Sequence, residues 1–165
     1  LAATSNGRIG MIATQASVRS GAYERTLRAL DPAVTVIQKA CPLFVPLAEE
    51  GRTRPGDLVI ETVAEEYLAS LREEGIDTLI LGCTHYPLLT ETIRGIMGEG
   101  VSLVNIGVPA ARYVHGMLSE KDALSGKPAE YHYFVSDMTE EFTALAETFL
   151  ELDRPDIKKI DINKY

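Results

Sequence analysis

The sequence predicts an α/β protein with a mostly parallel sheet flanked by helices. Short runs of apolar and β-branched residues alternate along the chain with stretches in which apolar residues recur at helical spacing. That alternation is typical of this fold class. The strand over residues 76–83 (IDTLILGC) is apolar enough to be buried on both faces. The helix that begins at Asp57 and ends at Gly75 carries a single apolar stripe.

The other elements follow the same alternation. Strands are predicted over residues 8–14, 34–40, 101–107, 131–136 and 157–162, and helices over residues 21–30, 87–98, 109–124 and 140–150. Ser20 is a typical N-cap for the first of these helices, and Asp137 with Glu140 forms a D-x-x-E capping pattern before the last. Residues 15–20 are predicted to form a loop. Most of residues 41–51 should also be irregular, because two prolines and a glycine oppose regular structure there.

Composition and charge argue against several classes of function. The chain has 165 residues, 45% hydrophobic and 24% charged, which is the profile of a soluble globular protein with a real core. Its net charge of -8 has the wrong sign for a nucleic-acid partner. No apolar run approaches the roughly 18 residues that span a membrane, so no membrane partner is expected. The first residues, LAATSNGR, lack the features of a secretory signal and a starting Met, which suggests a fragment.

The cysteines and glycines bear on compartment and cofactors. Cys41 and Cys83 are too few for a disulfide scaffold, and no C-x-x-C pair indicates structural zinc. We therefore expect a reducing, cytoplasmic compartment. Gly98 and Gly100 precede a strand and lack a third glycine, so they do not form a phosphate-binding loop. No nicotinamide or flavin cofactor is expected.

The candidate functional residues follow the predicted strands. In open parallel sheets, ligands bind beyond the carboxyl ends of the strands. Three groups stand at such ends: Thr14 with Ser17, residues 41–50, and Cys83 with Thr84 and His85. Gly82 permits a sharp turn, and Pro87 starts the next helix. The motif around Cys83 is therefore expected at a helix N-terminus, where free N–H groups favour a thiolate or a bound carboxylate.

The residues alone leave alternatives open at this motif. Cys83 and His85 also fit a buried apolar residue and a histidine satisfied within a turn. They fit half of a zinc site as well, although His115 and His132 have no recognisable ligand spacing. A catalytic pair, a metal site and an ordinary turn are thus three readings of one stretch.

The loop after the second strand has similar alternatives. Cys41 precedes a proline in an apolar loop and fits a small structural residue. Glu49 and Glu50 close the loop and, as adjacent acids, are most often solvated. Either carboxylate also lies where a ligand of the sheet would bind.

Four segments resemble glutamate racemases, the cofactor-independent enzymes that interconvert L- and D-glutamate. The stretch LILGCTHYPLL resembles the second cysteine motif of that family, and RIGMIATQASVRSGAYERTL, ACPLFVPLAEEG and YFVSDMTEEFTALAETFL resemble further segments. The resemblance implies that one cysteine thiolate removes the α-proton of glutamate while a second thiol protonates the opposite face. It also implies a role in supplying D-glutamate for peptidoglycan.

The resemblance assigns roles residue by residue. Cys83 matches the acid/base of one face, and His85 the group that assists its ionisation. Thr84 would donate its hydroxyl and backbone N–H to a substrate carboxylate. Glu49 matches an acid associated with the substrate ammonium or with the other half of the proton relay, with Glu50 as the fallback.

The hydroxyl residues and the organisation of the chain complete these expectations. Thr14 and Ser17 match two hydroxyl positions that would bind substrate. The family's first lobe carries a D-S-G motif, a P-Y-G turn and the first catalytic cysteine, none of which occurs in this sequence. Residues 1–104 would therefore form the second catalytic lobe, and residues 105–165 a segment that completes the first. The chain alone would then be inactive.

Other functions remain open at this stage. The substrate could instead be aspartate, a hydantoin or another α-acidic carboxylate. A non-catalytic protein-binding module is an alternative of a different class, because the acidic charge suits a basic protein surface. A homodimer is also open, and its geometry cannot be read from the sequence.

Overall fold

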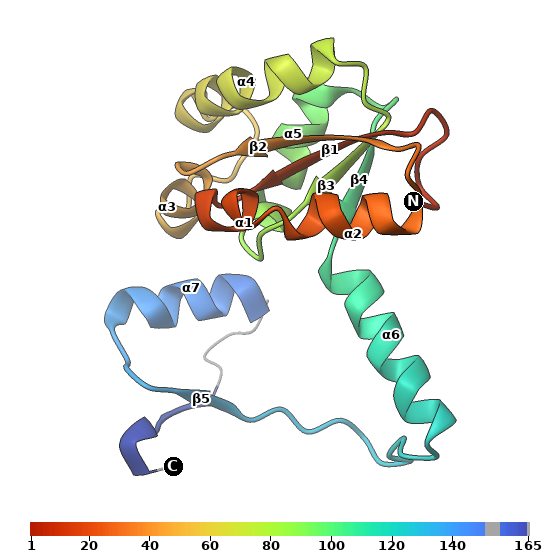
Figure 1. Ribbon diagram of the computed structural model, residues 1–165. Coiled ribbons are helices and arrows are strands. Elements are labelled where there is room, and N and C mark those ends of the chain that lie inside the picture. The colour runs from red at the N-terminus through yellow and green to blue at the C-terminus, as the bar shows by residue number, and fades with distance from the viewer. Residues whose placement is uncertain (151–155, 165) are drawn as a thin grey trace. The chain divides into compact units, whose positions relative to one another are not determined.

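A computed structural model describes residues 1–150 and 156–164, except the side chains of residues 140, 141, 144 and 148. In chain order the elements are β1 (Arg8–Ala13), α1 (Gln15–Ser20), α2 (Ala22–Leu30), β2 (Thr35–Ala40), α3 (Phe44–Glu49), α4 (Leu58–Glu73), β3 (Thr78–Leu81), the 3₁₀ turn η1 (Tyr86–Leu89), α5 (Thr90–Met97), β4 (Ser102–Asn105), α6 (Gly107–Glu120), β5 (Tyr133–Val135), α7 (Glu140–Leu150), β6 (Ile157–Lys159) and the 3₁₀ turn η2 (Ile162–Lys164) (Figure 1). They form two compact units, residues 1–121 and residues 122–165.

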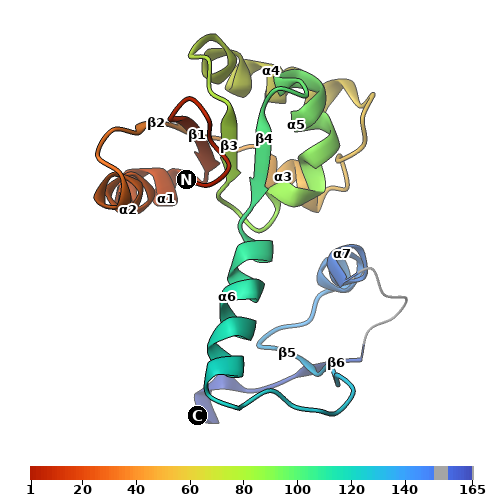
Figure 2. The same ribbon diagram turned by 90° about the vertical axis from the view of Figure 1, so that its right-hand side faces the viewer.

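The first unit is built on a four-stranded sheet. Its strand order is β2-β1-β3-β4, and all three pairings are parallel, which confirms the predicted fold class. Helices α1 and α2 cover one face, while α4 and α5 cover the other (Figures 1 and 2). In this arrangement the carboxyl ends of the strands meet at one edge of the sheet.

The core of this unit lies between the sheet and helices α4 and α5. Val63 and Tyr67 of the apolar stripe of α4 are half-buried. The other members of the stripe are fully buried, as are residues of β3 and α5 in the same cluster: Ile60, Ala64, Leu68, Leu71, Leu79, Leu81 and Ile93. Burying each large aliphatic side chain stabilises a fold by about 1.5–3 kcal/mol. Asp57 accepts a hydrogen bond from the N–H of Val59 at 2.9 Å, so the predicted start of this helix is confirmed.

A turn at the chain start is fastened to the beginning of β3. The carboxylate of Asp77 accepts hydrogen bonds from the hydroxyl of Thr4 and the N–H of Ser5, both at 2.6 Å, and from the N–H of Asn6 at 2.7 Å. These donors, the Thr4 hydroxyl first, hold the pKa of Asp77 well below its usual range because they stabilise the ionised form.

The prediction of a loop over residues 15–20 is wrong, because these residues form α1. Thr14 caps the helix: its hydroxyl accepts from the N–H of Ser17 at 3.4 Å. Gly21 ends it in a left-handed conformation, with φ +62°, and leads directly into α2. Ser20 is therefore the last residue of α1, and the N-cap of α2 is Gly21 and not the predicted Ser20.

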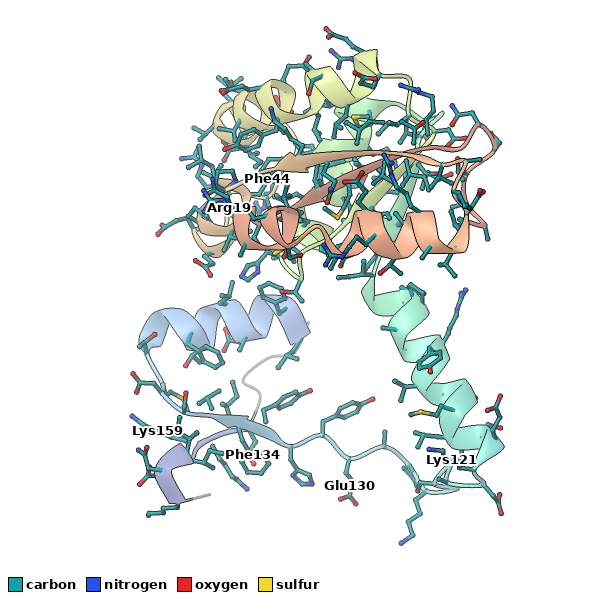
Figure 3. The ribbon with its side chains drawn as sticks, in the orientation of Figure 1. Arg19, Phe44, Lys121, Glu130, Phe134 and Lys159 are labelled. Atoms are coloured by element: carbon teal, nitrogen blue, oxygen red, sulfur yellow. The ribbon has the colours of Figure 1, made fainter. Side chains whose placement is uncertain are left out.

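The loop over residues 41–51 is also partly helical. Residues Phe44–Glu49 form α3, and Pro46 lies in its first turn, where a missing N–H leaves no hydrogen bond unmade. Phe44, labelled in Figure 3, and Ala48 are buried. Packing of these apolar side chains thus overrides the unfavourable local sequence.

The predicted helix over residues 87–98 has two parts. The chain first makes the 3₁₀ turn η1, with Pro87 at its second position, and the α-helix begins only at Thr90. Cys83 to His85 therefore precede a single tight turn. The expected dipole of a regular α-helix at these residues is correspondingly lacking.

The second unit holds a short parallel pair, β5 and β6, with α7 between them in the chain. The hydroxyl of Thr139 caps α7 by accepting from the N–H of Phe142 at 3.1 Å, so Asp137 is not the cap. Asp137 instead pairs with Lys159 at 2.6 Å. The side chain of Glu140, the other half of the predicted capping pattern, lies outside the described residues.

Helix α6 links the two units in the chain. All of its side chains are exposed or half-buried, and it ends just before the boundary at residues 121 and 122. The assignment of residues 105–165 to another lobe stays a prediction. Across residues 1–150 and 156–164, no helix is long and apolar enough to cross a membrane.

Candidate active site

Three strand ends form the candidate site. Thr14 follows β1, Cys41 follows β2, and Cys83 follows β3 after a single glycine. Because β1 lies between the other two strands, the residues after it have a neighbour on each side. Ile12 pairs with Leu81, so Thr14 lies alongside the turn that carries Cys83.

Gly82 brings that turn against β1. Its N–H donates to the carbonyl of Ile12 at 2.8 Å, which extends the ladder between β1 and β3. A Cβ at this position would lie 2.9 Å from the same carbonyl oxygen and 3.2 Å from the Cβ of Ala13. Only glycine fits such a close approach of two backbones.

The side chains of Cys83, His85 and Glu49 form a chain of polar contacts. The Sγ of Cys83 lies 3.9 Å from Nδ1 of His85. The other ring nitrogen, Nε2, lies 3.3 Å from Oε1 of Glu49. Cys83 is half-buried, and the side chain of His85 is 21% exposed against 48% for Glu49. The thiol of Cys83 is thus less exposed to solvent than the carboxylate of Glu49.

This arrangement defines how His85 can act. A proton on Nε2 of the neutral ring would face the carboxylate of Glu49, and this tautomer leaves Nδ1 as an acceptor. Nδ1 then faces the thiol of Cys83. The imidazole can therefore take the proton of Cys83, and Glu49 stabilises the imidazolium that results.

The structure distinguishes the two adjacent carboxylates geometrically. Glu49, the last residue of α3, is the one in reach of His85, whereas Glu50 is exposed beyond the helix end. Glu49 contacts the imidazole ring of His85. Its contact supports a part in the relay more directly than a contact with a substrate ammonium.

The predicted hydroxyl residues lie at the same edge. The hydroxyl of Thr84 is exposed and lies 3.4 Å from Nδ1 of His85, so the ring nitrogen has both a thiol and a hydroxyl within reach. The hydroxyls of Thr14 and Ser17 lie 3.1 Å apart and are half-buried. Two pairs of polar groups therefore flank the carboxyl ends of β1 and β3.

Cys41 is unsuited to acid/base chemistry. Its side chain is fully buried, and burial raises the pKa of its thiol to about 12. Its Sγ donates weakly to the carbonyl of Lys39 at 3.8 Å. The interpretation of Cys41 as a structural residue agrees with this position.

Tyr86 was not among the residues that the sequence pointed to. Its ring is fully buried and its hydroxyl donates to the carbonyl of Cys41 at 2.9 Å. The only signal in the sequence is its position directly after His85. Burial cannot be read from that position, because a tyrosine in a turn is as often exposed.

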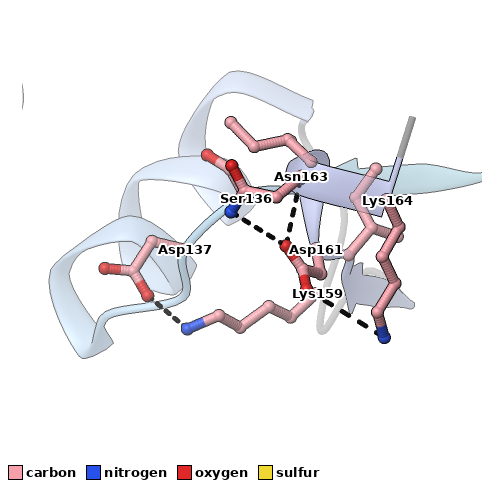
Figure 4. A pocket seen from close by; sticks show the side chains of 8 residues that line it. Ser136, Asp137, Lys159, Asp161, Asn163 and Lys164 are labelled. Atoms are coloured by element: carbon pink, nitrogen blue, oxygen red, sulfur yellow. Dashed lines mark hydrogen bonds and ion pairs between the residues drawn. The ribbon is translucent and has the colours of Figure 1, made fainter.

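The remaining polar features of the described residues involve other side chains. No group of three His, Cys, Asp or Glu residues in the described part of the chain could hold a metal ion. A shallow hollow in the second unit is lined by residues 136–137 and 159–164 (Figure 4). Its lysines are engaged: Lys159 pairs with Asp137 at 2.6 Å, and Lys164 lies 4.0 Å from Asp161. None of the candidate residues lines it.

Comparisons with known proteins bear on what this edge of the sheet does. Residues 1–113 match the family model described as Asp/Glu/Hydantoin racemase. A glutamate racemase of Geobacter metallireducens is 42% identical over 163 residues, which is 98% of this chain and 60% of the relative. One from Chlorobaculum parvum is 40% identical over 159 residues, covering 95% of this chain and 58% of the relative.

Solved structures of glutamate racemases are similar to this chain as well. Glutamate racemase from Francisella tularensis in complex with D-glutamate has a TM-score of 0.88 at 32% identity, covering 96% of this chain and 59% of the other. The enzyme from Thermus thermophilus in complex with β-chloro-D-alanine has a TM-score of 0.80 at 34% identity, covering 96% and 58%. The chain spans about 60% of the length of the curated relatives that it matches. It belongs to the Asp/Glu/hydantoin racemase family.

Proposed function

We propose that this chain is part of a glutamate racemase and carries one of its two catalytic thiols. The polar chain from Cys83 through His85 to Glu49 is the observation that supports this most. The names of its relatives supply glutamate as the substrate. No cofactor is required by a mechanism that moves only protons.

Cys83 acts as the acid/base on one face of the substrate. Nδ1 of His85 takes the thiol proton, so the sulfur becomes a thiolate. The thiolate then removes the α-proton: the C–H bond breaks, an S–H bond forms, and the electron pair stays on the α-carbon and its carboxylate. A second thiol on the opposite face returns a proton to that carbon, which inverts its configuration. In the reverse direction Cys83 is the donor.

The hydroxyl residues bind the substrate. Thr84 donates its hydroxyl and backbone N–H to a carboxylate, which stabilises the negative charge that develops when the α-proton leaves. Thr14 and Ser17 bind the rest of the molecule from the neighbouring strand end. Glu49 orients His85 and fixes its tautomer, and Glu50 has no direct part.

The second thiol lies outside this sequence. The chain has two cysteines, and burial with a pKa of about 12 leaves Cys41 protonated. Residues 1–104 thus provide one catalytic lobe, and residues 105–165 contribute to the other. This chain alone should bind glutamate weakly and should not racemise it.

The enzyme acts in the cytoplasm and supplies D-glutamate for peptidoglycan, and so for cell wall biogenesis and cell shape. Glutamate is its only small-molecule partner in this scheme, with neither nucleic acid nor membrane involved. A homodimer is compatible with the scheme and is not needed for the proton transfers.

Exchange of the α-proton of glutamate with solvent deuterium tests this function. The product of the complete gene should exchange both enantiomers, and the chain of 165 residues should exchange neither. Cys83→Ala should lower exchange by about 10²–10⁴-fold, the usual contribution of an acid/base group. Cys41→Ala is the matched control, since it removes the other thiol and should leave exchange intact. Full activity of Cys83→Ala would exclude the assignment.

The substrate and the class of function need separate tests. Faster turnover of aspartate or a hydantoin than of glutamate by the same protein would favour another member of the family. Capture of a protein partner by the chain, equally strong in Cys83→Ala, together with no exchange by the complete gene product, would favour a binding module.

A further inference from the structure

Two polar contacts run from the turn after β3 to the segment after β2. The turn carries Cys83 and His85 and is called the catalytic turn below. His85 contacts Glu49 at 3.3 Å, and the hydroxyl of the next residue, Tyr86, donates to the carbonyl of Cys41 at 2.9 Å. Strands β2 and β3 are not neighbours, because β1 lies between them. Both contacts therefore span the end of β1 and join the same two segments.

The two contacts differ in burial. The contact between His85 and Glu49 is partly exposed, with side-chain exposures of 21% and 48%. An ion pair or hydrogen bond at such a position holds two flexible side chains poorly, because water competes for both groups. It cannot by itself fix the distance between a turn and a helix. Something more rigid must set that distance.

Tyr86 has the rigidity that this contact lacks. Its ring is fully buried and meets Phe44 edge to face, with ring centroids 5.3 Å apart at 87°. Phe44 is the first residue of α3, and Glu49 is the last. The N–H of Tyr86 also donates to the carbonyl of Cys83 at 3.2 Å. One residue thus contacts the start of α3, the end of β2 and the catalytic turn.

We propose that Tyr86 is a positioning residue that holds α3 at the spacing at which Glu49 reaches His85. The inference rests on the proposed function, in which that contact keeps Nδ1 of His85 available to the thiol of Cys83. Tyr86 touches neither the thiol nor the substrate in this scheme. It acts through the spacing between α3 and the turn that carries Cys83.

Tyr86→Phe isolates the hydroxyl, because the ring and its packing against Phe44 are kept. Two measurements follow the site: the ¹⁵N chemical shifts of the His85 ring, and the rate at which iodoacetamide alkylates Cys83. Loss of one hydrogen bond of ordinary strength should lower the alkylation rate by about two- to tenfold. The His85 signal should shift in the same direction as in Glu49→Gln.

Tyr67→Phe is the matched control. Tyr67 lies in the same aromatic cluster, 5.3 Å from Phe44, and its hydroxyl oxygen accepts from the N–H of Leu43 at 3.4 Å. These contacts join the start of α3 to α4 and leave the spacing between α3 and the turn that carries Cys83 untouched. Its loss should leave the His85 signal and the alkylation rate unchanged.

The double variant separates positioning from a general effect on the fold. If Tyr86 acts through Glu49, Tyr86→Phe has no further effect once Glu49→Gln is present. Additive effects would overturn the inference, and so would an unchanged His85 signal in Tyr86→Phe. Should Tyr86→Phe not fold, Phe44→Leu should give the same Glu49-dependent shift, and its absence would count equally against the inference. If Glu49→Gln itself changes neither readout, the relay of the proposed function fails instead.

Discussion

Replacing Gly82 by alanine tests how closely the turn of Cys83 must approach β1. The added Cβ would lie 2.9 Å from the carbonyl oxygen of Ile12, a backbone atom that cannot swing away as a side chain does. The same oxygen accepts the N–H of residue 82 at 2.8 Å. The strand ladder must therefore open locally, or the turn must move outward.

The size of the effect follows from this clash. Inserting a methyl group where backbone must shift costs about 1–3 kcal/mol. For a chain of this length, each kcal/mol lowers the melting temperature by roughly 2–4 °C. Gly82→Ala should therefore melt about 2–12 °C lower than the parent. Cys83 should also react with iodoacetamide at an altered rate, because it follows the displaced residue.

Gly95→Ala is the matched substitution. Gly95 is exposed on α5, and a Cβ there would meet nothing within 4 Å. Alanine in a helix is favoured over glycine by roughly 0.5–1 kcal/mol, so this variant should melt slightly higher. Thermal unfolding followed by circular dichroism measures both variants. The reasoning would be refuted by a Gly82→Ala variant that melts at or above the parent and keeps the parent's rate at Cys83.

Three further expectations concern titration and exchange. The contribution of Asp77 to the stability of the fold should be complete above about pH 4 and be lost as the pH falls towards its depressed pKa. In a plot of the urea unfolding midpoint against pH, Asp77→Asn should therefore flatten the fall at acid pH. An unchanged fall would contradict this. At pH 8, mass spectrometry should find iodoacetamide on Cys83 and none on Cys41, because a pKa of about 12 leaves on the order of one Cys41 thiol in ten thousand ionised. Equal labelling of both thiols would rule out the buried position. In the complete gene product, Glu49→Gln should slow α-proton exchange by about tenfold or more while Glu50→Gln does not. A reversed order would transfer the role to Glu50.

The sheet and the long helix could be predicted because their signals are local. A strand such as Thr78–Leu81 is a continuous apolar run, and α4 shows its stripe over four turns. Helices α1 and α3 have six residues each, which is too short for a periodic pattern. Their stability comes from a cap at Thr14 and from burial of Phe44, and neither is visible in the order of the residues alone.

The candidate site could be predicted only in part. The rule that ligands bind beyond the strand ends brought Thr14 and Cys83 to one edge, because it needs only the positions where parallel strands end. The choice between Glu49 and Glu50 needed α3, since successive side chains on a helix point about 100° apart. The role of Tyr86 could not be predicted, because it follows from the burial of its ring against Phe44, a residue of another segment.

The bond from Tyr86 to Cys41 has a consequence for folding. It joins residues 45 apart in the chain, from strand ends that lie on either side of β1. The loop that it closes is shorter than the 73 residues between Thr4 and Asp77, so we expect it to form together with the strand pairings that bring its two ends within reach. A chain stopped earlier would have a hydrophobic core and a thiol, but no aligned imidazole beside it. The contacts that join Cys83, His85 and Glu49 would therefore be complete only in the folded chain.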